Sequence, residues 1–250
     1  MEEHFFKFAI FSAFSELTCG ISNRNFGDMR FGYQKQADIV KNRAQFLGQL
    51  NINISDLVVP VLAHGAQIAI VGQHDKGKGA TDHKTAITAT DGLITCESGV
   101  YLMVTVADCL PVLIYDPILK ITGVIHAGWR GIIAQIVPKA INKFKTLGSV
   151  PQNLVVGVGP GICQKHFIVK KDVLDLFLNQ YPSSTFVRNN DGYVDLKKAV
   201  LTDLKNMGVL SSNIEISNIC TVCENGIYGS YRKENDAVKA SAAVIGIKNK

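Results

Sequence analysis

The sequence predicts a single α/β domain spanning residues 1–250. Short apolar runs rich in β-branched residues, such as 112–115 and 121–125, are bounded by turn residues and are typical of buried strands. From residue 132 to 144 the apolar side chains recur at intervals of three and four, which indicates an amphipathic helix. Because no linker, repeat or low-complexity segment interrupts the chain, one α/β domain accounts for these patterns.

Apolar spacing and turn residues define the elements expected in the first half of the chain. These are a strand over 8–14, a loop over 18–28, a helix over 35–50, a strand pair formed by 57–62 and 67–72, and strands over 90–95 and 99–106. Arg43 falls within the apolar stripe of the helix. From spacing alone we expect its stem to lie along apolar surface and its head to reach water.

The same criteria define the second half. We expect strands over 112–115, 121–125, 154–158 and 214–219, helices over 132–148, 171–178 and 196–207, and a closing strand or helix over 237–247. Pro138 lies inside the first of these helices. A kink or a division into two helices is therefore expected there.

Charge and cysteine content limit the class of protein. The net charge of +5 is mild and the lysines are scattered, so nucleic acid is a weak candidate partner and a small anionic substrate fits as well. Six irregularly spaced cysteines do not suit a disulfide framework and favour a reducing compartment. Residues 1–7 lack signal-peptide character, and no run approaches the roughly 18 apolar residues of a membrane span. We therefore expect a cytoplasmic protein with no membrane partner.

The chemistry concentrates in residues 104–131. Cys109 precedes the strand at 112–115 and His126 follows the strand at 121–125. If the chain reverses at Asp116-Pro117 and the strands pair antiparallel, both side chains lie at the same end of the sheet. That arrangement suits a metal site or a nucleophile with its base.

Several chemical interpretations of these residues remain open. His64, Cys109 and His126 are the imidazole and thiolate ligands that suit zinc, which needs only three protein ligands in a catalytic site. Cys109 could instead be a nucleophile with His126 as its base, or both residues could be structural. Because the adjacent Asp108 disfavours a thiolate whereas a bound cation favours one, the metal hypothesis is preferred.

Two further motifs give weaker signals. Cys220 and Cys223 have the C-x-x-C spacing of redox or zinc sites, but with no second such pair we expect them to be structural or incidental. The turn at 159–161, Gly-Pro-Gly, lacks the Lys-Ser or Lys-Thr that follows a phosphate-binding loop.

The longest motifs resemble the laccase-domain family, also called multicopper polyphenol oxidase-like and regarded as purine nucleoside phosphorylases. They are A-D-C-L-P-V-L-I-Y-D-P at 107–117, H-A-G-W-R-G at 126–131 and T-D-G-L-I-T at 90–95. Shorter matches are Asn42-Arg43, His64-Gly65, Gly159-Pro160-Gly161-Ile162 and Ser230-Tyr231-Arg232. The resemblance covers most of the chain from about residue 20 onward.

The resemblance implies a catalytic zinc held by His64, Cys109 and His126. It also implies mixed β-sheets flanked by helices, similar to toxin-type cysteine hydrolases. The implied activities are phosphorolysis of adenosine, inosine, guanosine and S-methyl-5'-thioadenosine, and deamination of adenosine. Copper-dependent polyphenol oxidation is the alternative, but six histidines without a His-x-His pair offer little to a multicopper centre.

Phosphorolysis requires a group that holds the phosphate dianion beside the sugar. Arginine suits bidentate phosphate contacts, so we expect this group among Arg43 first and then Arg24, Arg130 and Arg232. The alternative for Arg130 is a structural pair with Asp108 or Asp116. The sequence departs from the family pattern at Leu62 and over residues 16–22, which leaves the preferred nucleoside open.

Overall fold

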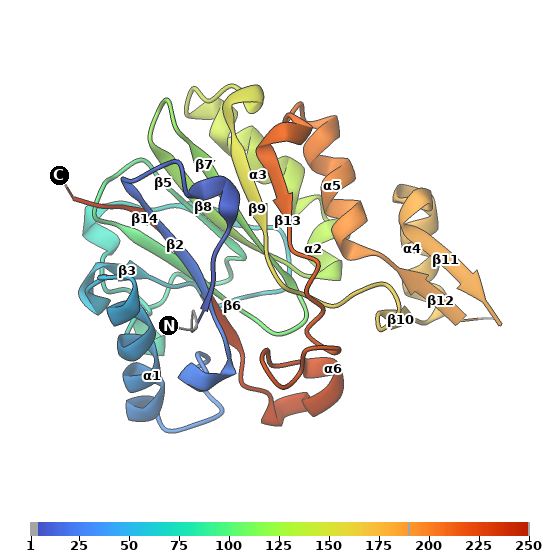
Figure 1. The fold of residues 1–250 in the computed structure, drawn as a ribbon, viewed down its shortest axis with the longest axis horizontal. Coiled ribbons are helices and arrows are strands. Elements are labelled where there is room, and N and C mark those ends of the chain that lie inside the picture. The colour runs from blue at the N-terminus through green and yellow to red at the C-terminus, as the bar shows by residue number, and fades with distance from the viewer. Residues whose placement is uncertain (1–4, 190, 250) are drawn as a thin grey trace.

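The computed structural model of the chain describes residues 5–189 and 191–249. Two large β-sheets form the centre of the molecule, and helices cover their outer faces (Figure 1). The expectation about the N-terminal sequence falls largely on residues 1–4, outside the described part. No helix among the described residues is both long and apolar enough to cross a membrane.

The first large sheet has five strands. In spatial order these are β1 (Phe5–Phe6), β2 (Leu17–Ser22), β14 (Ser241–Ile247), β6 (Tyr101–Val106) and β3 (Leu57–Val58). Neighbours are antiparallel except β3, which runs parallel to β6. The closing segment of the chain is therefore a strand at the centre of this sheet.

The second large sheet has six strands. In order they are β13 (Ile214–Ile216), β9 (Val155–Val158), β7 (Leu110–Asp116), β8 (Ile121–Ala127), β5 (Gly92–Thr95) and β4 (Ile68–Ile70). The central pairs are antiparallel, whereas β13–β9 and β4–β5 are parallel. Both large sheets are therefore mixed, as expected.

A small sheet projects from the second large sheet beside α4 (Lys171–Gln180), at the right of Figure 1. Its strands are β10 (Ile168–Val169), β12 (Asp191–Val194) and β11 (Thr185–Arg188). No strand was predicted here, because these strands are short and partly exposed and lack a buried apolar run. Phe186 and Val187, for example, are more than half exposed.

Successive side chains of a strand point to opposite faces of its sheet, and this alternation explains how the sheets and helices are layered. Leu102 and Val104 of β6 pack against Leu113 of β7 in the core between the two large sheets. The intervening Met103 packs in a separate core beneath α1 (Gln36–Gln49). On the far side, Val112 and its neighbours pack beneath α3 (Ile136–Thr146) and α5 (Leu196–Asn206). The order of layers is helix, sheet, sheet, helices.

The predicted helices and the central hairpin are confirmed. α1 occupies nearly all of residues 35–50, and β7 pairs antiparallel with β8 through the turn at Asp116. The segment 132–148 divides into α2 (Trp129–Ile133) and α3, with the break at Gln135, whose φ is +64°. Pro138 lies in the first turn of α3, where its missing N–H costs nothing.

The first predicted strand is wrong. Residues 9–11 form a 3₁₀ turn that lets Phe8 and Phe11 pack against Gly157 of β9. The strand lies instead at β2, in a segment that was expected to be a loop. Gly20 gave that segment its loop-like composition, yet it is needed in the strand because the ring of Phe5 lies against it, 2.9 Å from where a Cβ would stand.

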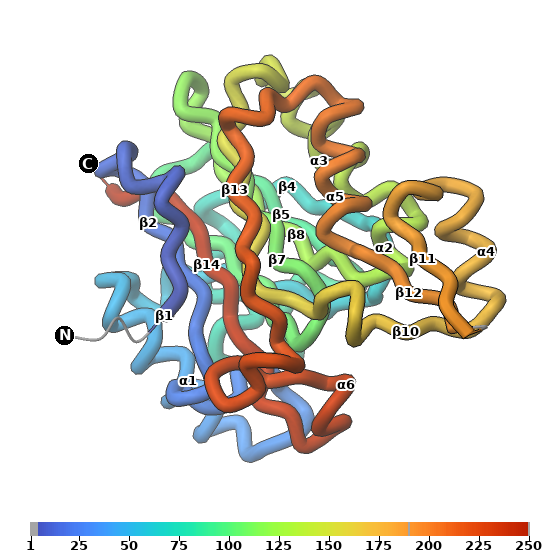
Figure 2. The backbone as a smooth tube through the Cα atoms, turned by 45° about the vertical axis from the view of Figure 1, so that its right-hand side comes forward, coloured from blue at the N-terminus to red at the C-terminus, as the bar shows by residue number. Residues whose placement is uncertain are grey.

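The predicted pairing of 57–62 with 67–72 is also wrong. β3 belongs to the first large sheet and β4 to the second, so the chain between them crosses from one sheet to the other. His64 lies on this crossing. The tube in Figure 2 shows β4 and β5 behind β7 and β8, on the side away from β13.

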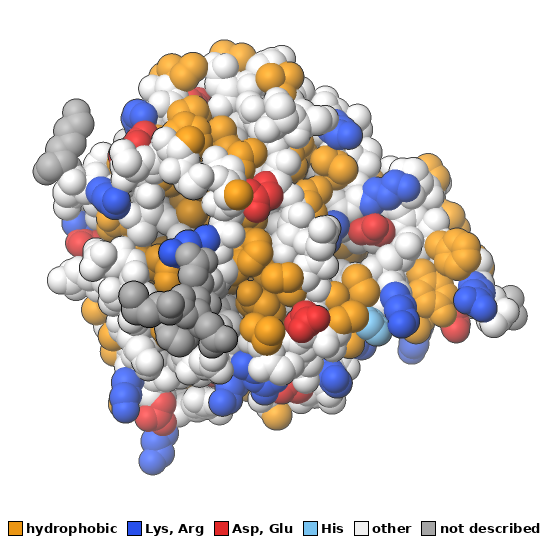
Figure 3. All heavy atoms as spheres, viewed as in Figure 1, with side chains coloured by type: hydrophobic (Ala, Val, Ile, Leu, Met, Phe, Trp, Pro, Cys, Tyr) orange, Lys and Arg blue, Asp and Glu red, His pale blue; other side chains and the backbone are white. Residues whose placement is uncertain are grey.

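Lys and Arg side chains are dispersed over the face drawn in Figure 3, consistent with their scatter in the sequence.

Candidate metal centre and active site

The β7–β8 hairpin brings Cys109 and His126 together. The register pairs Pro111 with His126 and Leu110 with Ala127, so Cys109 lies opposite Gly128. A Cβ on Gly128 would lie 3.0 Å from the Cys109 sulfur and 3.4 Å from Cε1 of His126. The thiol and the imidazole therefore share one small space, which the missing side chain of Gly128 leaves open.

His64 reaches the same space from the crossing between the sheets. Its ring centroid lies 5.0 Å from that of His126, with the two planes at 87°. The backbone of His64 has a φ of +56°, a left-handed conformation that is unfavourable for a residue with a side chain. Such an outlier at a cluster of metal-ligating side chains is a sign that the surroundings hold the residue in place.

Asp91 holds His64 and also faces His126. Its completely buried carboxylate accepts the backbone N–H groups of His64 and Gly65, each at 2.8 Å. The same carboxylate lies 3.5 Å from Nδ1 of His126, which leaves Nε2 of that ring available for a metal. From the sequence, Asp91 was expected only as part of the strand over 90–95, and its place in the family motif over the same residues was the signal for this role.

The electrostatics of the two imidazoles are opposite. Burial alone lowers the pKa of His126, but the negative charges of Cys109 and Asp91 outweigh burial and raise this pKa to about 9. Burial and the positive charges of His126 and Arg130 lower the pKa of His64. Although burial raises the pKa of Asp91, its hydrogen bonds and the charge of His126 lower it further, so the carboxylate is charged.

These side chains fit a metal ion. Two imidazoles and one thiol form the N/N/S set of catalytic zinc sites that leave one position open. Nδ1 of His126 is buried and has no hydrogen-bond partner in the described part of the chain, although it lies near a carboxylate. A carboxylate behind a ligating imidazole fixes the ring and makes it a stronger ligand.

The three residues line a cavity of about 930 Å³. Its wall includes the aromatic side chains Phe31, Trp129 and Phe167, and the loop residues Gly79 and His83 close one side. The volume lies within the range of about 300–1,000 Å³ that is typical of small-molecule sites. The cavity can therefore hold a planar heterocycle together with a sugar and a small anion.

Arg43 lines the cavity but its guanidinium is occupied. The side chain is 2% exposed, so the expectation that its head reaches water is wrong. It donates to the carbonyl oxygens of Met29, Gly79 and Ala80 at 2.6–3.0 Å and lies over the ring of Phe31. Burial lowers its pKa to about 9, although Asp28 opposes this effect. Arg43 thus joins the two loops that form this wall.

Arg24 and Arg232 also have structural partners. Arg24 donates to the carbonyl of Asn225 and pairs with Glu234 at 2.9 Å, and it is not among the residues that line the cavity. Arg232 lines the cavity, and its Nη1 donates to the carbonyls of His166 at 2.7 Å and Ile168 at 3.2 Å.

Arg130 differs from the other three candidates. It lies on the first turn of α2, is exposed, lines the cavity and stacks on Trp129, with its guanidinium carbon 4.4 Å from the ring centroid. Its guanidinium makes no hydrogen bond or ion pair with the residues that the structure describes. The predicted pairing with Asp108 or Asp116 is wrong, because Asp108 binds Thr221 and the N–H of Arg232, and Asp116 caps its own turn.

The expectation for Cys220 and Cys223 needs a correction. They do have a second pair of donors beside them, because Cys163 and His166 lie next to them in space. The four ligand atoms lie within 4.8 Å of one another, so this Cys₃His cluster can hold a metal ion. The signal in the sequence is the C-x-x-H pair at 163–166, which complements the C-x-x-C pair although it contains only one cysteine.

Comparison with known proteins gives consistent results. The family model described as "Multi-copper polyphenol oxidoreductase laccase" matches residues 11–248. "Purine nucleoside phosphorylase YlmD" of Bacillus subtilis (strain 168) is 30% identical over 247 residues, which cover 96% of this chain and 89% of that protein. "Adenosine deaminase RL5" of an unknown prokaryotic organism is 29% identical over 74% of this chain and 72% of its own.

Solved structures agree with the fold. The crystal structure of YlmD from Geobacillus stearothermophilus superposes with a TM-score of 0.93 at 27% sequence identity, covering all of this chain and 98% of the other. The mixed α/β architecture of the chain is therefore shared over its full length with that protein.

Proposed function

Because the chain belongs to the multi-copper polyphenol oxidoreductase laccase family, we propose that it is a zinc-dependent purine nucleoside phosphorylase that also deaminates adenosine. Relatives named purine nucleoside phosphorylase and adenosine deaminase support an enzyme of the purine nucleoside type. The proposed substrates are adenosine, inosine, guanosine and S-methyl-5'-thioadenosine, with inorganic phosphate as the second substrate.

One observation carries the proposal. His64, Cys109 and His126 meet at the wall of a 930 Å³ cavity that also contains an arginine with no hydrogen-bonded partner in the described chain. A metal site with an open position, aromatic walls and a cation are what a purine, its ribose and a phosphate require.

Arg130 is the phosphate-binding group in this proposal. A phosphate dianion accepts two parallel hydrogen bonds from a guanidinium, and Arg130 alone of the four arginines has no hydrogen bond to another described residue. The guanidinium stacks on Trp129, which leaves its N–H groups available to the phosphate. Arg43 instead supports the wall from behind.

The reaction is a displacement at the anomeric carbon. A phosphate oxygen forms a bond to C1' of the ribose as the C1'–N9 bond breaks, and the leaving purine takes up the proton that the hydrogen phosphate dianion gives up. Arg130 orients the phosphate, and the aromatic wall formed by Phe31, Trp129 and Phe167 holds the purine and excludes water. His64 and His126 keep their positions because Asp91 holds both.

A zinc ion held by His64, Cys109 and His126 would supply Lewis-acid polarisation and a source of hydroxide at neutral pH, the chemistry that deamination at C6 needs. Asp91 orients the ligands, and Cys109 is a ligand rather than a covalent nucleophile.

Turnover of adenosine tests the proposal. The purified protein is incubated with adenosine, with and without phosphate, and the products are separated by chromatography. We expect inosine alone without phosphate, and adenine and hypoxanthine in addition when phosphate is present. A chelator should abolish both activities and zinc should restore them.

Other outcomes identify the alternatives. Activity that survives complete zinc removal but is lost on thiol alkylation would show Cys109 to be a nucleophile, with His126, which shares the same small space, as its base. Bound copper with oxidation of phenolic dyes would show an oxidase. No turnover of any nucleoside would refute the proposed function.

A further inference from the structure

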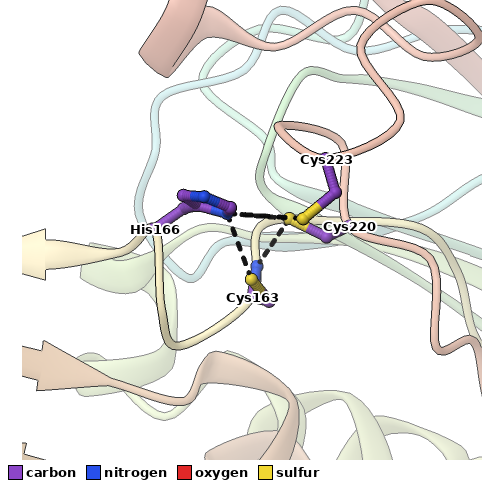
Figure 4. Close-up of side chains that lie close together, drawn as sticks. All are labelled: Cys163, His166, Cys220 and Cys223. Carbon is purple, nitrogen blue, oxygen red and sulfur yellow. Dashed lines mark hydrogen bonds between the residues drawn. The ribbon is translucent and has the colours of Figure 1, made fainter.

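A second group of metal-ligating side chains lies outside the cluster formed by His64, Cys109 and His126. Cys163, His166, Cys220 and Cys223 point toward one another from two loops, as Figure 4 shows. The three cysteines have free thiols, so no disulfide explains the approach. We refer to these four residues as the Cys₃His cluster.

The fold brings the two loops together. β9 and β13 are adjacent parallel strands, with Val156 opposite Ile214 and Val158 opposite Ile216. The segments that follow parallel neighbours leave the sheet at the same edge. The first of these segments carries Cys163 and His166, and the second carries Cys220 and Cys223.

Backbone hydrogen bonds continue beyond the strands and hold the loops in register. The N–H of Gly161 donates to the carbonyl of Ile219 at 3.4 Å, and the N–H of Thr221 donates to the carbonyl of Gly161 at 3.3 Å. The N–H of Cys163 donates to the sulfur of Cys220 at 3.3 Å. The positions of the donors are therefore set by the backbone.

The separations match a tetrahedral zinc site. Zn–S bonds of about 2.3 Å and Zn–N bonds of about 2.0–2.1 Å at tetrahedral angles place a nitrogen about 3.6 Å from each sulfur. Nδ1 of His166 lies 3.3 Å from the sulfur of Cys163 and 3.6 Å from those of Cys220 and Cys223. The three nitrogen–sulfur edges of a coordination tetrahedron are thus already present.

Hydrogen bonding alone does not account for this arrangement. Nδ1 of an imidazole has either one N–H or one lone pair, so it can form a hydrogen bond with one thiol and not with three. Three sulfurs at nearly equal distances from one nitrogen are explained by a cation shared among all four atoms.

The surroundings suit the charge of such a site. One zinc ion with three thiolates and a neutral imidazole carries a net charge of −1. The ammonium of Lys197 donates to the carbonyls of Ser217 at 2.6 Å and Ile219 at 2.8 Å, beside Cys220. The N–H of Cys163 adds a hydrogen bond to a sulfur, as is common around zinc-bound thiolates.

We propose that Cys163, His166, Cys220 and Cys223 bind a second, structural zinc ion. Four protein ligands close the coordination shell, so this site stabilises the fold rather than performing chemistry. The ion would connect the loop that supplies Ile162 and Phe167 to the cavity wall with the loop that leads to Tyr231 and Arg232. The proposal does not depend on the reaction assigned to the cavity.

Metal content of purified variants tests the proposal. Protein purified without added metal should contain two zinc ions per chain by elemental analysis. The double variant Cys163→Ser/Cys223→Ser should contain only the zinc ion at the cavity. The double variant His64→Ala/Cys109→Ala should contain only the zinc ion of the Cys₃His cluster. Cys96→Ser is the matched control, because Cys96 is an exposed thiol outside both clusters, and it should contain two.

Cobalt substitution assigns each ion to its ligands. Thiolate-to-cobalt charge-transfer absorption grows with the number of bound thiolates, so the His64→Ala/Cys109→Ala protein should keep most of this band. The Cys163→Ser/Cys223→Ser protein should lose most of it. If these cysteine variants do not fold, the single variant Cys223→Ser, which changes an exposed residue, should release zinc to a chelating dye at a lower dye concentration than the wild type.

Two results would overturn the proposal. One is an equal zinc content in folded wild type and folded Cys163→Ser/Cys223→Ser protein. The other is a disulfide between members of the Cys₃His cluster, detected by mass spectrometry of freshly purified, unreduced protein, since a disulfide removes two ligands.

Discussion

The two clusters of metal-ligating side chains differ in number, partners and access. In the proposed active site, His64, Cys109 and His126 would supply three ligands at the wall of a cavity, and Asp91 supports both histidines. The Cys₃His cluster supplies four ligands within 4.8 Å, next to the surface, from two hydrogen-bonded loops. Three ligands leave a coordination position for substrate, whereas four leave none, so ligand number separates the catalytic from the structural role.

The largest expected difference in nucleoside turnover is between the variants Cys109→Ala and Cys163→Ala. Cys109→Ala should lower nucleoside turnover by more than about 100-fold, because losing even a residue behind a ligand costs about 10–100-fold. Cys163→Ala should retain turnover but unfold at a lower temperature, by about 2–4 °C for each kcal/mol of stability lost. Activity assays and thermal melts of both variants make the test. Equal effects on turnover would contradict the division of roles.

Asp91→Asn tests the support behind the three-ligand cluster. The amide keeps the size of the carboxylate but loses its charge, so zinc affinity and turnover should each fall by about 10–100-fold. Asp116→Asn is the control, because Asp116 is also fully buried but caps the turn at the other end of the same hairpin. An effect of equal size from both variants would mean that Asp91 acts only through stability.

Arg130→Ala tests the phosphate site. Hydrogen bonds to charged groups contribute about 1.5–3 kcal/mol, so KM for phosphate should rise by about 10- to 100-fold with zinc content unchanged. Arg130→Lys should restore part of the affinity because it keeps the charge. Arg188→Ala, on β11 of the small sheet, is the matched control and should have no effect.

Arg43→Ala tests whether Arg43 binds phosphate or only supports the cavity wall. Because the guanidinium of Arg43 joins Met29 to Gly79 and Ala80, we expect a lower thermal midpoint. A rise in KM for phosphate in Arg43→Ala, with no change in Arg130→Ala, would restore Arg43 as the phosphate group.

A last prediction concerns the pH dependence of stability at a buried carboxylate outside both clusters. Burial raises the pKa of Asp203 to about 6, and a hydrogen bond from Tyr181 opposes this only in part. The folded protein therefore binds this proton more tightly than the unfolded chain, so stability falls as pH rises from about 4 to about 6. Asp203→Asn should remove this decline, worth up to about 3 kcal/mol at 1.4 kcal/mol per pKa unit.

Loss of metal has the opposite pH dependence. Protons compete with zinc for its ligands at low pH, so metal loss makes the protein less stable as pH falls. Chemical denaturation of wild type and Asp203→Asn between pH 4 and pH 7 measures the contribution of Asp203. Parallel pH profiles for the two proteins would show that Asp203 does not titrate in this range.

The sequence by itself determined the features that depend on local pattern. The hairpin that joins Cys109 to His126 follows from two apolar runs and one turn, and α1 follows from helical spacing. The family motifs lie on the same segments, so two of the three ligands in the cavity could be placed from the sequence.

Only the tertiary structure decided which distant segments meet. His64 lies on a crossing between two sheets, and its position depends on Asp91, 27 residues away. Arg43 lies within the apolar stripe of its helix, but only the structure shows that loops from elsewhere in the chain bury its guanidinium. The Cys₃His cluster exists because β9 and β13 pair in parallel, which brings the C-x-x-H and C-x-x-C pairs together. In the sequence, 53 residues lie between His166 and Cys220. Strand order is a property of the whole fold, so no local pattern predicts it.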